Sequence, residues 1–144
     1  MYLTNMSYLK NIAVHMLLLC APFLLLSQAQ ASDLSLAPKQ VVTELIEAME
    51  ANDAEKIRSL FSTNATQEYE RWWTRKKQGD AFRKWLESDI ISVHGRINNP
   101  VLKANGNELV VTGTYVNNDN YSSAADFLLV VENGKIMSWT MRYD

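Results

Sequence analysis

The residues from Ser122 to Val131 form a strongly apolar stretch that contains a single carboxylate, Asp126. A carboxylate held among side chains such as Ala125 and Phe127 must either take up a proton or find a hydrogen-bonding or cationic partner. In a pocket, Asp126 would be the strongest acid–base candidate in the chain. It could instead tie a neighbouring strand or helix end in place, or bind a polar group of a ligand, and all three interpretations stay open.

A second chemical feature is a run of four cations and two indoles within seven residues: Arg71, Trp72, Trp73, Thr74, Arg75, Lys76 and Lys77. Such side chains can stack on bases or sugars, or lie at a membrane interface. Basic residues also commonly flank buried aromatic residues and cover them with their stems. We therefore favour a structural role in which one tryptophan closes the core, with binding of an anionic ligand or an envelope surface as the functional alternative.

Histidine and cysteine are scarce in this sequence. Cys20 is the sole cysteine, and His94 is the only histidine after residue 31. One histidine without evident partners assembles neither a metal site nor a Ser-His-Asp arrangement, so His94 is interpreted as a surface or strand-edge residue. No metal and no cofactor are expected, and the candidate chemistry rests on carboxylates, tyrosines and tryptophans.

The first 31 residues have the three parts of a secretory signal. Lys10 makes the start basic, an apolar run of 15 residues spans Ile12 to Leu26, and Ala29-Gln30-Ala31 is a small-residue cleavage site. That run is shorter than the roughly 20 residues that cross a bilayer as a helix. We expect cleavage before Ser32, removal of Cys20, no integral membrane segment after processing, and a periplasmic or secreted location.

The predicted mature protein, residues 32–144, has the length of one domain. Lys10 is the only charged residue before Asp33, so this part holds 13 of the 14 Lys and Arg residues against all 16 Asp and Glu residues, a net charge of −3. A net acidic, exported domain has no general attraction for nucleic acid. Nucleic acid is therefore not expected as a partner.

Residue spacing predicts three helices followed by four strands. After Pro38, apolar residues at helical spacing indicate a helix over 38–51, Asp53 is a good N-cap for a second helix, and Gly79-Asp80 precedes a third that reaches Ile90. Asn-Gly pairs mark hairpin turns between strands expected over residues 95–104, 108–117, 122–131 and 135–143. Helices followed by a run of strands predict an α+β fold.

In the last of these strands, polar residues alternate with four apolar ones, Met137, Trp139, Met141 and Tyr143. Alternation with a period of two places the apolar residues on one face, which another layer must cover. The chain also carries several short motifs in a characteristic order: Val41-Val42 through Ala48, Asn52-Asp53 with Ile57 and Leu60-Phe61, Asn64-Ala65-Thr66, Ala125-Asp126-Phe127, and Asn133-Gly134-Lys135-Ile136.

Together these motifs resemble the nuclear transport factor 2-like (NTF2-like) superfamily, which includes SnoaL-like proteins and ketosteroid isomerases. The resemblance covers nearly all of residues 32–144. It implies three N-terminal helices packed on a strongly curved, mixed or antiparallel sheet that forms a cone. Such domains are often dimeric through the outer sheet face and have a ligand pocket at the open end of the cone.

Carried over by position, the resemblance to ketosteroid isomerases places their oxyanion-donating tyrosine at Leu45, their proton-shuttling aspartate at Tyr69, and a second, protonated aspartate at Asp126. Leu45 cannot donate a hydrogen bond, and a tyrosine that ionises near pH 10 is a poor base at neutral pH. Isomerisation is therefore disfavoured, and with it an enzymatic function. The resemblance implies these pocket-lining residues: Leu45, Tyr69, Asp126, Trp139, Met141 and Tyr143.

The expected function is binding of a small apolar or amphipathic molecule in the cone pocket, without chemistry, by a homodimer. A second hypothesis is an isomerase- or dehydratase-type enzyme that uses Asp126 as acid or base and Tyr69 as a hydrogen-bond donor. A third is a dimeric protein-interaction module whose pocket is filled by its own side chains. An open pocket would separate the first two hypotheses from the third.

Overall fold

A computed structural model of the chain describes residues 36–71 and 75–142, which belong to one compact unit, Ser35–Asp144. The predicted signal peptide, residues 1–31, lies outside the described residues. So do Trp72, Trp73 and Tyr143. Among the helices of the described part, none has the length and apolar character needed to cross a membrane.

The first two helices lie where the capping and spacing signals predicted them. Helix α1 (Pro38–Glu50) begins at the proline, whose missing N–H costs nothing in a first turn. Helix α2 (Ala54–Ser59) is capped by the Asp53 carboxylate, which accepts a hydrogen bond from the Lys56 N–H at 3.0 Å. One face of α1 is buried in the core through Val41, Val42, Leu45, Ala48 and Met49.

The third helix changes its winding halfway along. Helix α3 (Asp80–Trp85) continues as a π-helical segment, η1 (Leu86–Ile91). A π-helical turn holds more residues than an α-helical turn, which shifts the direction of the side chains that follow, and such turns are frequent at functional sites. The sequence pattern predicted a regular helix up to Ile90, so this change of winding is a finding of the structure.

Six strands form one mixed sheet in the order β2-β1-β6-β5-β4-β3. Their bounds are β1 (Phe61–Tyr69), β2 (Lys77–Gln78), β3 (Arg96–Asn105), β4 (Glu108–Val116), β5 (Ser122–Glu132) and β6 (Lys135–Met141). Strand β1 is parallel to β6, and the other neighbours are antiparallel. The edges β2 and β3 do not pair, so the sheet is not closed. The predicted α+β class with a mixed sheet is confirmed.

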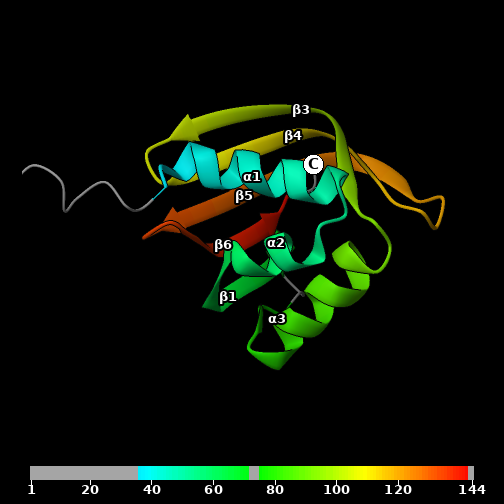
Figure 1. The fold of residues 1–144 in the computed structure, drawn as a ribbon, viewed down its shortest axis with the longest axis horizontal. Helices are drawn as coiled ribbons and strands as arrows, with labels where there is room; N and C mark the ends of the chain where they lie inside the picture. Colours follow the sequence, from blue (N-terminus) through cyan, green and yellow to red (C-terminus); the bar gives the residue numbers. More distant parts are fainter. Residues whose placement is uncertain (1–35, 72–74, 143–144) are drawn as a thin grey trace, which may run out of the picture. The chain divides into compact units, whose positions relative to one another are not determined.

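The helices cover one face of this curved sheet. Figure 1 shows α1 lying across the long strands β3, β4 and β5, while α3 lies near β1 and β2 at the other end of the sheet. Trp139 of β6 is fully buried between the layers. Its ring lies 5.4 Å from that of Trp85 and 5.2 Å from that of Phe127, measured between centroids. This aromatic cluster joins the helices to the sheet and forms the centre of the core.

Strand β3 contains a bulge that its sequence did not predict. The pairing of β3 with β4 changes register between Asn98 and Val101, and Asn99 has a φ of 51°. Opposite the bulge, Gly113 of β4 has a φ of 154°. Bulges bend a strand and increase its twist, so this one contributes to the curvature of the sheet over the helices.

Candidate ligand pocket

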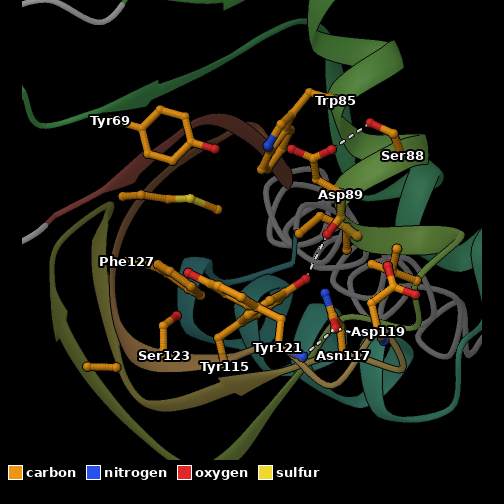
Figure 2. A pocket seen from close by; sticks show the side chains of 14 residues that line it. Tyr69, Trp85, Ser88, Asp89, Tyr115, Asn117, Asp119, Tyr121, Ser123 and Phe127 are labelled. Atoms are coloured by element: carbon orange, nitrogen blue, oxygen red, sulfur yellow. Dashed lines mark hydrogen bonds between the residues drawn. The ribbon is translucent and has the colours of Figure 1, made fainter.

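A cavity of about 310 Å³ opens on the concave side of the sheet, next to α3 and η1. Its apolar and aromatic lining includes Tyr69, Trp85, Tyr115, Tyr121, Phe127 and Met141. Its polar lining includes Ser88, Asp89, Asn117, Asp119 and Ser123. Figure 2 shows Tyr69 and Trp85 on one side of the cavity and Tyr115, Tyr121 and Phe127 on the other. The pocket is therefore open and amphipathic in character.

The sheet register places the cavity side chains on neighbouring strands. Tyr69 at the end of β1 is level with Met141 of β6, which is level with Phe127 of β5. Tyr115 of β4 is opposite Ser123 of β5. Because side chains alternate between the two faces of a strand, these five residues all face the concave side.

The π-helical segment supplies the acidic side of the cavity. Ser88, Asp89 and Ile90 of η1 all line it. The Ser88 hydroxyl donates a hydrogen bond of 2.6 Å to Oδ1 of Asp89, and the Tyr115 hydroxyl donates one of 2.7 Å to the Asp89 carbonyl oxygen. These two bonds fix both the backbone and the carboxylate of Asp89 relative to the sheet, as Figure 2 shows.

The position of Tyr115 is fixed from behind as well. A Cβ atom at Gly95 would lie 2.9 Å from Cε2 of the Tyr115 ring, closer than real side chains approach. At the rim, the Asn117 side-chain oxygen accepts hydrogen bonds from the backbone N–H groups of Asp119 and Tyr121, at 2.9 and 3.1 Å. This turn chemistry holds the β4–β5 connection in place beside the cavity.

The hydroxyls of Tyr69 and Tyr115 in the cavity are held in their protonated form. Burial raises the pKa of Tyr69, and the Asp89 carboxylate raises it further. Hydrogen bonding with the Trp85 indole lowers this pKa in part. Burial likewise raises the pKa of Tyr115; a hydrogen bond with Asn117 lowers it in part, and Asp89 adds to the increase. Both phenols are thus hydrogen-bond donors at neutral pH and poor proton acceptors.

These shifts predict a loss of stability at alkaline pH. Above about pH 10 the unfolded chain loses its tyrosine protons while folded Tyr69 and Tyr115 still hold theirs, so the free energy of unfolding falls as pH rises. We expect a shallower fall in the Tyr69→Phe and Tyr115→Phe variants, measured by urea denaturation at several pH values around and above 10. Unchanged slopes in both variants would contradict the assignment.

The structure places the six predicted pocket residues, Asp126 among them, in different surroundings. Tyr69 and Met141 line the cavity, as the resemblance implied. Leu45 is 1 % exposed in the core face of α1, and Trp139 lies behind Trp85 and Phe127 rather than at the cavity surface. The sixth residue, Tyr143, lies outside the described part of the chain.

Asp126 faces the opposite side of the sheet from the cavity. Its neighbours Ala125 and Phe127 are buried, and strand alternation therefore directs Asp126 to the outer face. There Oδ1 of Asp126 accepts hydrogen bonds from Nε and Nη2 of Arg142, the residue that follows β6, at 2.9 and 2.5 Å. Of the three interpretations that the sequence left open, this geometry corresponds to a carboxylate that ties a neighbouring strand.

The sequence analysis missed Asp89, Tyr115 and Tyr121. Tyr115 could have been found, because it shares a strand face with Leu109 and Val111, and the far end of a buried face is a natural place for a pocket. Asp89 could not, since in a regular helix nothing distinguishes it from a solvent-exposed acid. Only the π-helical winding of η1 explains its place in the cavity.

The basic segment contributes one side chain beside the pocket. Lys77 donates a hydrogen bond of 2.9 Å to the Gln67 side-chain oxygen, and its ammonium group lies 4.8 Å from the centre of the Tyr69 ring. Lys76 lies 3.9 Å from a Glu68 carboxylate oxygen. Trp72 and Trp73 are not among the described residues, so the predicted core role of one of them stays a prediction.

The structure also shows the surroundings of His94 and of the side chains that could hold a metal ion. Within residues 36–71 and 75–142, no group of three or more His, Cys, Asp and Glu side chains is placed to hold a metal ion. His94 is half-buried, and its Nε2 lies 3.0 Å from the Glu50 carbonyl oxygen at the end of α1. It therefore links the turn between η1 and β3 to the first helix.

No protein family and no curated protein match the sequence. Solved structures do match the fold. An NTF2-like protein of unknown function from Cytophaga hutchinsonii superposes with a TM-score of 0.64 and 17% identity, covering 78% of this chain and 94% of that one. A proposed ketosteroid isomerase from Kribbella flavida gives 0.61 and 12%, with 74% and 77% covered.

A proposed polyketide cyclase from Pseudomonas putida also matches, with a TM-score of 0.59 and 14% identity over 76% of this chain and 93% of that chain. The chain thus has the NTF2-like fold that its motifs predicted. Relatives at this level of identity share the fold, and one fold of this kind carries several activities. Function must therefore be argued from the cavity of this chain.

Proposed function

We propose that this NTF2-like domain is exported and binds a small amphipathic molecule in its aromatic cavity without converting it chemically. The cavity volume of about 310 Å³ is at the lower end of the range for small-molecule sites, which are typically apolar with a few placed polar groups. Its lining supplies aromatic surface from both the sheet and α3.

The observation that carries the proposal is the indole N–H of Trp85. Trp85 is 3 % exposed and lines the cavity; its Nε1 atom makes no hydrogen bond of good geometry among the described residues, although the indole lies close enough to the Tyr69 hydroxyl to lower the pKa of that phenol by hydrogen bonding. A buried donor without an acceptor costs about 1–3 kcal/mol. A ligand oxygen in the cavity would satisfy this donor, so an apolar body with a carbonyl or hydroxyl oxygen fits the site.

Binding without chemistry is supported by what the described lining contains. Two serines, Ser88 and Ser123, supply the aliphatic hydroxyl groups of the described lining. Neither has a histidine or lysine beside it among the lining residues. Nucleophilic catalysis needs an activating base. The group that accepts the hydrogen bond of Ser88 is the Asp89 carboxylate, and carboxylates are ordinarily weaker bases than imidazole. Tyr69 and Tyr115 keep their protons at neutral pH, and Tyr115 donates its own to the Asp89 carbonyl oxygen.

A homodimer is part of the proposal. The outer face of β4 and β5 carries the partly exposed apolar side chains Val110, Leu128 and Val130. Self-association through a sheet face covers such a surface and is typical of the NTF2-like domains that the sequence resembles. Native mass spectrometry of the protein from its own host should report the mass of two chains together with any retained ligand.

The binding test uses prodan, a naphthalene with one ketone oxygen. We expect saturable binding with a blue-shifted emission and one probe per chain. Ser123→Phe should abolish binding, because Ser123 lines the cavity and a phenyl ring would fill it. Ser122→Phe is the matched control, since the preceding residue is exposed and outside the lining. Binding that survives Ser123→Phe, or absence of saturable binding, would overturn the proposal.

The role of Trp85 is tested with a second probe that lacks the ketone oxygen, 2-dimethylamino-6-propylnaphthalene. The ketone should bind about fivefold more tightly, the effect of one hydrogen bond of about 1 kcal/mol. In Trp85→Phe this preference should disappear, whereas the affinity for the second probe should change little. A preference that persists in the variant would assign the donor to another group.

A further inference from the structure

The charged residues that line the cavity are both acidic. Its described lining includes the carboxylates of Asp89 and Asp119 and contains no lysine, arginine or histidine. Some carboxylates elsewhere in the domain are paired with cations: Glu44 with Lys56, Glu87 with Arg58, and Asp126 with Arg142. Within the described residues, Asp89 and Asp119 have no such cationic partner. The cavity therefore holds negative charge that the chain itself leaves unbalanced.

The aromatic rings of the cavity stand at steep angles to one another. The Tyr115 ring lies 6.1 Å from that of Tyr121 at 60° and 6.4 Å from that of Phe127 at 68°, measured between centroids and ring planes. Tyr69 and Trp85 lie on the other side of the cavity (Figure 2). Rings at steep angles present several faces to one small volume, and aromatic faces attract cations, above all organic ammonium groups.

The chain contains its own instance of this contact. The Lys77 ammonium group lies 4.8 Å from the centre of the Tyr69 ring, although Lys77 is not part of the cavity lining. The same ammonium group donates a hydrogen bond of 2.9 Å to the Gln67 side-chain oxygen. An ammonium group on the cavity side would meet carboxylates in addition to ring faces.

Asp89 is placed to contribute most to cation binding. Ser88 holds Oδ1 of Asp89 by a 2.6 Å hydrogen bond, and the Asp89 backbone is fixed by Tyr115. The negative charge of Asp89 raises the pKa of both Tyr69 and Tyr115, so its field reaches these two phenols. The Asp89 carboxylate would repel an anionic ligand in the cavity.

We propose that the ligand of this cavity is an organic ammonium compound with an oxygen acceptor, bound by Asp89 and Asp119, by the aromatic faces, and by the Trp85 N–H. The inference rests on the proposed binding function and specifies the chemical class of the ligand. Two independent observations meet in it: the unpaired carboxylates and rings select the cation, while Nε1 of the buried Trp85, which lines the same cavity and has no hydrogen bond of good geometry among the described residues, selects the oxygen.

The test compares two ligands that differ only in charge, phenacyltrimethylammonium and its carbon isostere 3,3-dimethyl-1-phenylbutan-1-one. Calorimetric titration of the full chain should show that the ammonium compound binds at least about tenfold more tightly, the scale of a desolvated cation–π contact with an added charge pair. The preference should decrease as salt is added, because part of it is electrostatic between exposed groups. 3-Benzoylpropionate, an anion of similar size, should bind more weakly than either.

Asp89→Asn should remove most of this preference, because it should weaken binding of the ammonium compound far more than binding of the neutral ketone. Asp119→Asn should reduce it less, because Ser88 holds Oδ1 of Asp89 by a hydrogen bond, whereas only the backbone N–H of Asp119 is held, by Asn117. Asp126→Asn is the matched control: the same substitution on the outer face should leave the preference intact. Circular dichroism checks that all three variants are folded.

The outcomes separate the two proposals. Equal affinity for the ammonium compound and the ketone, or a preference that survives Asp89→Asn and Asp119→Asn together, overturns the ammonium inference while prodan binding still supports the pocket. Loss of binding for prodan, ketone and ammonium compound alike overturns the binding function itself and the inference with it.

Discussion

Replacing Trp139 by alanine should lower the free energy of unfolding by about 3–5 kcal/mol, as large-to-small changes of buried aromatic residues do. Trp139 is 0 % exposed. Its ring centroid lies 5.2 to 6.1 Å from those of Phe127, Trp85 and Phe61, so the indole joins two strands and α3. Urea denaturation at neutral pH measures the loss.

Trp139→Phe and Val101→Ala are the controls for this prediction. The Trp139 indole N–H has no hydrogen-bond partner among the described residues, so phenylalanine removes packing without breaking a hydrogen bond and should cost clearly less than alanine. Val101 is 53% exposed, and its truncation should change stability by less than about 0.5 kcal/mol. If Trp139→Ala cost as little as Val101→Ala, the central position of this indole would be refuted.

The elements that the sequence predicted well are those with a local chemical signal. Asp53 caps α2 through its own side chain, and Pro38 begins α1. Both Asn-Gly pairs lie at hairpins, but the two turns differ. Asn105 is the last residue of β3, so Gly106 and Asn107 form the first turn, whereas Asn133 and Gly134 form the second. A turn signal predicts that a hairpin exists more reliably than which residues occupy its corners.

The pairing of β1 with β6 could not be predicted in this way. These parallel strands join Tyr69 to Met141 across most of the domain, and no turn connects them directly. Residues 63–79 show no clear helical spacing, and β1 also shifts register against β6 between Phe61 and Thr66. Without that pairing, the position of Tyr69 in the cavity follows only from the resemblance to NTF2-like proteins.

The orientation of β5 is ambiguous in its sequence for a physical reason. One face carries Ala125, Phe127 and Leu129, and the other carries Asp126 with Leu128 and Val130. Both faces are rich in apolar residues, so alternation alone does not identify the core side. In the structure the face with Ala125 and Phe127 packs into the core, so Asp126 lies outside the cavity. The carboxylate that lines the cavity from a helical element is that of Asp89 in η1.

Gly113 fixes the junction of β3 and β4 where the sheet bends. A Cβ atom at this position would lie 2.7 Å from the Asn98 carbonyl oxygen and 2.9 Å from Cγ2 of Ile97. The first of these is backbone and cannot rotate away. The φ of 154° also lies in a region that residues other than glycine seldom occupy. The bulge and this glycine therefore depend on each other.

Gly113→Ala should accordingly destabilise the domain by about 2–4 kcal/mol, the sum of backbone strain and overpacking. Gly106→Ala is the matched control: Gly106 has a φ of 61°, but a Cβ atom there meets nothing within 4 Å, so only the strain of about 1 kcal/mol applies. Thermal and urea denaturation of both variants measure the difference, which isolates the steric contact with Asn98. Equal losses in the two variants would show that β3 moves freely away from Gly113, and that the bulge does not depend on this close approach.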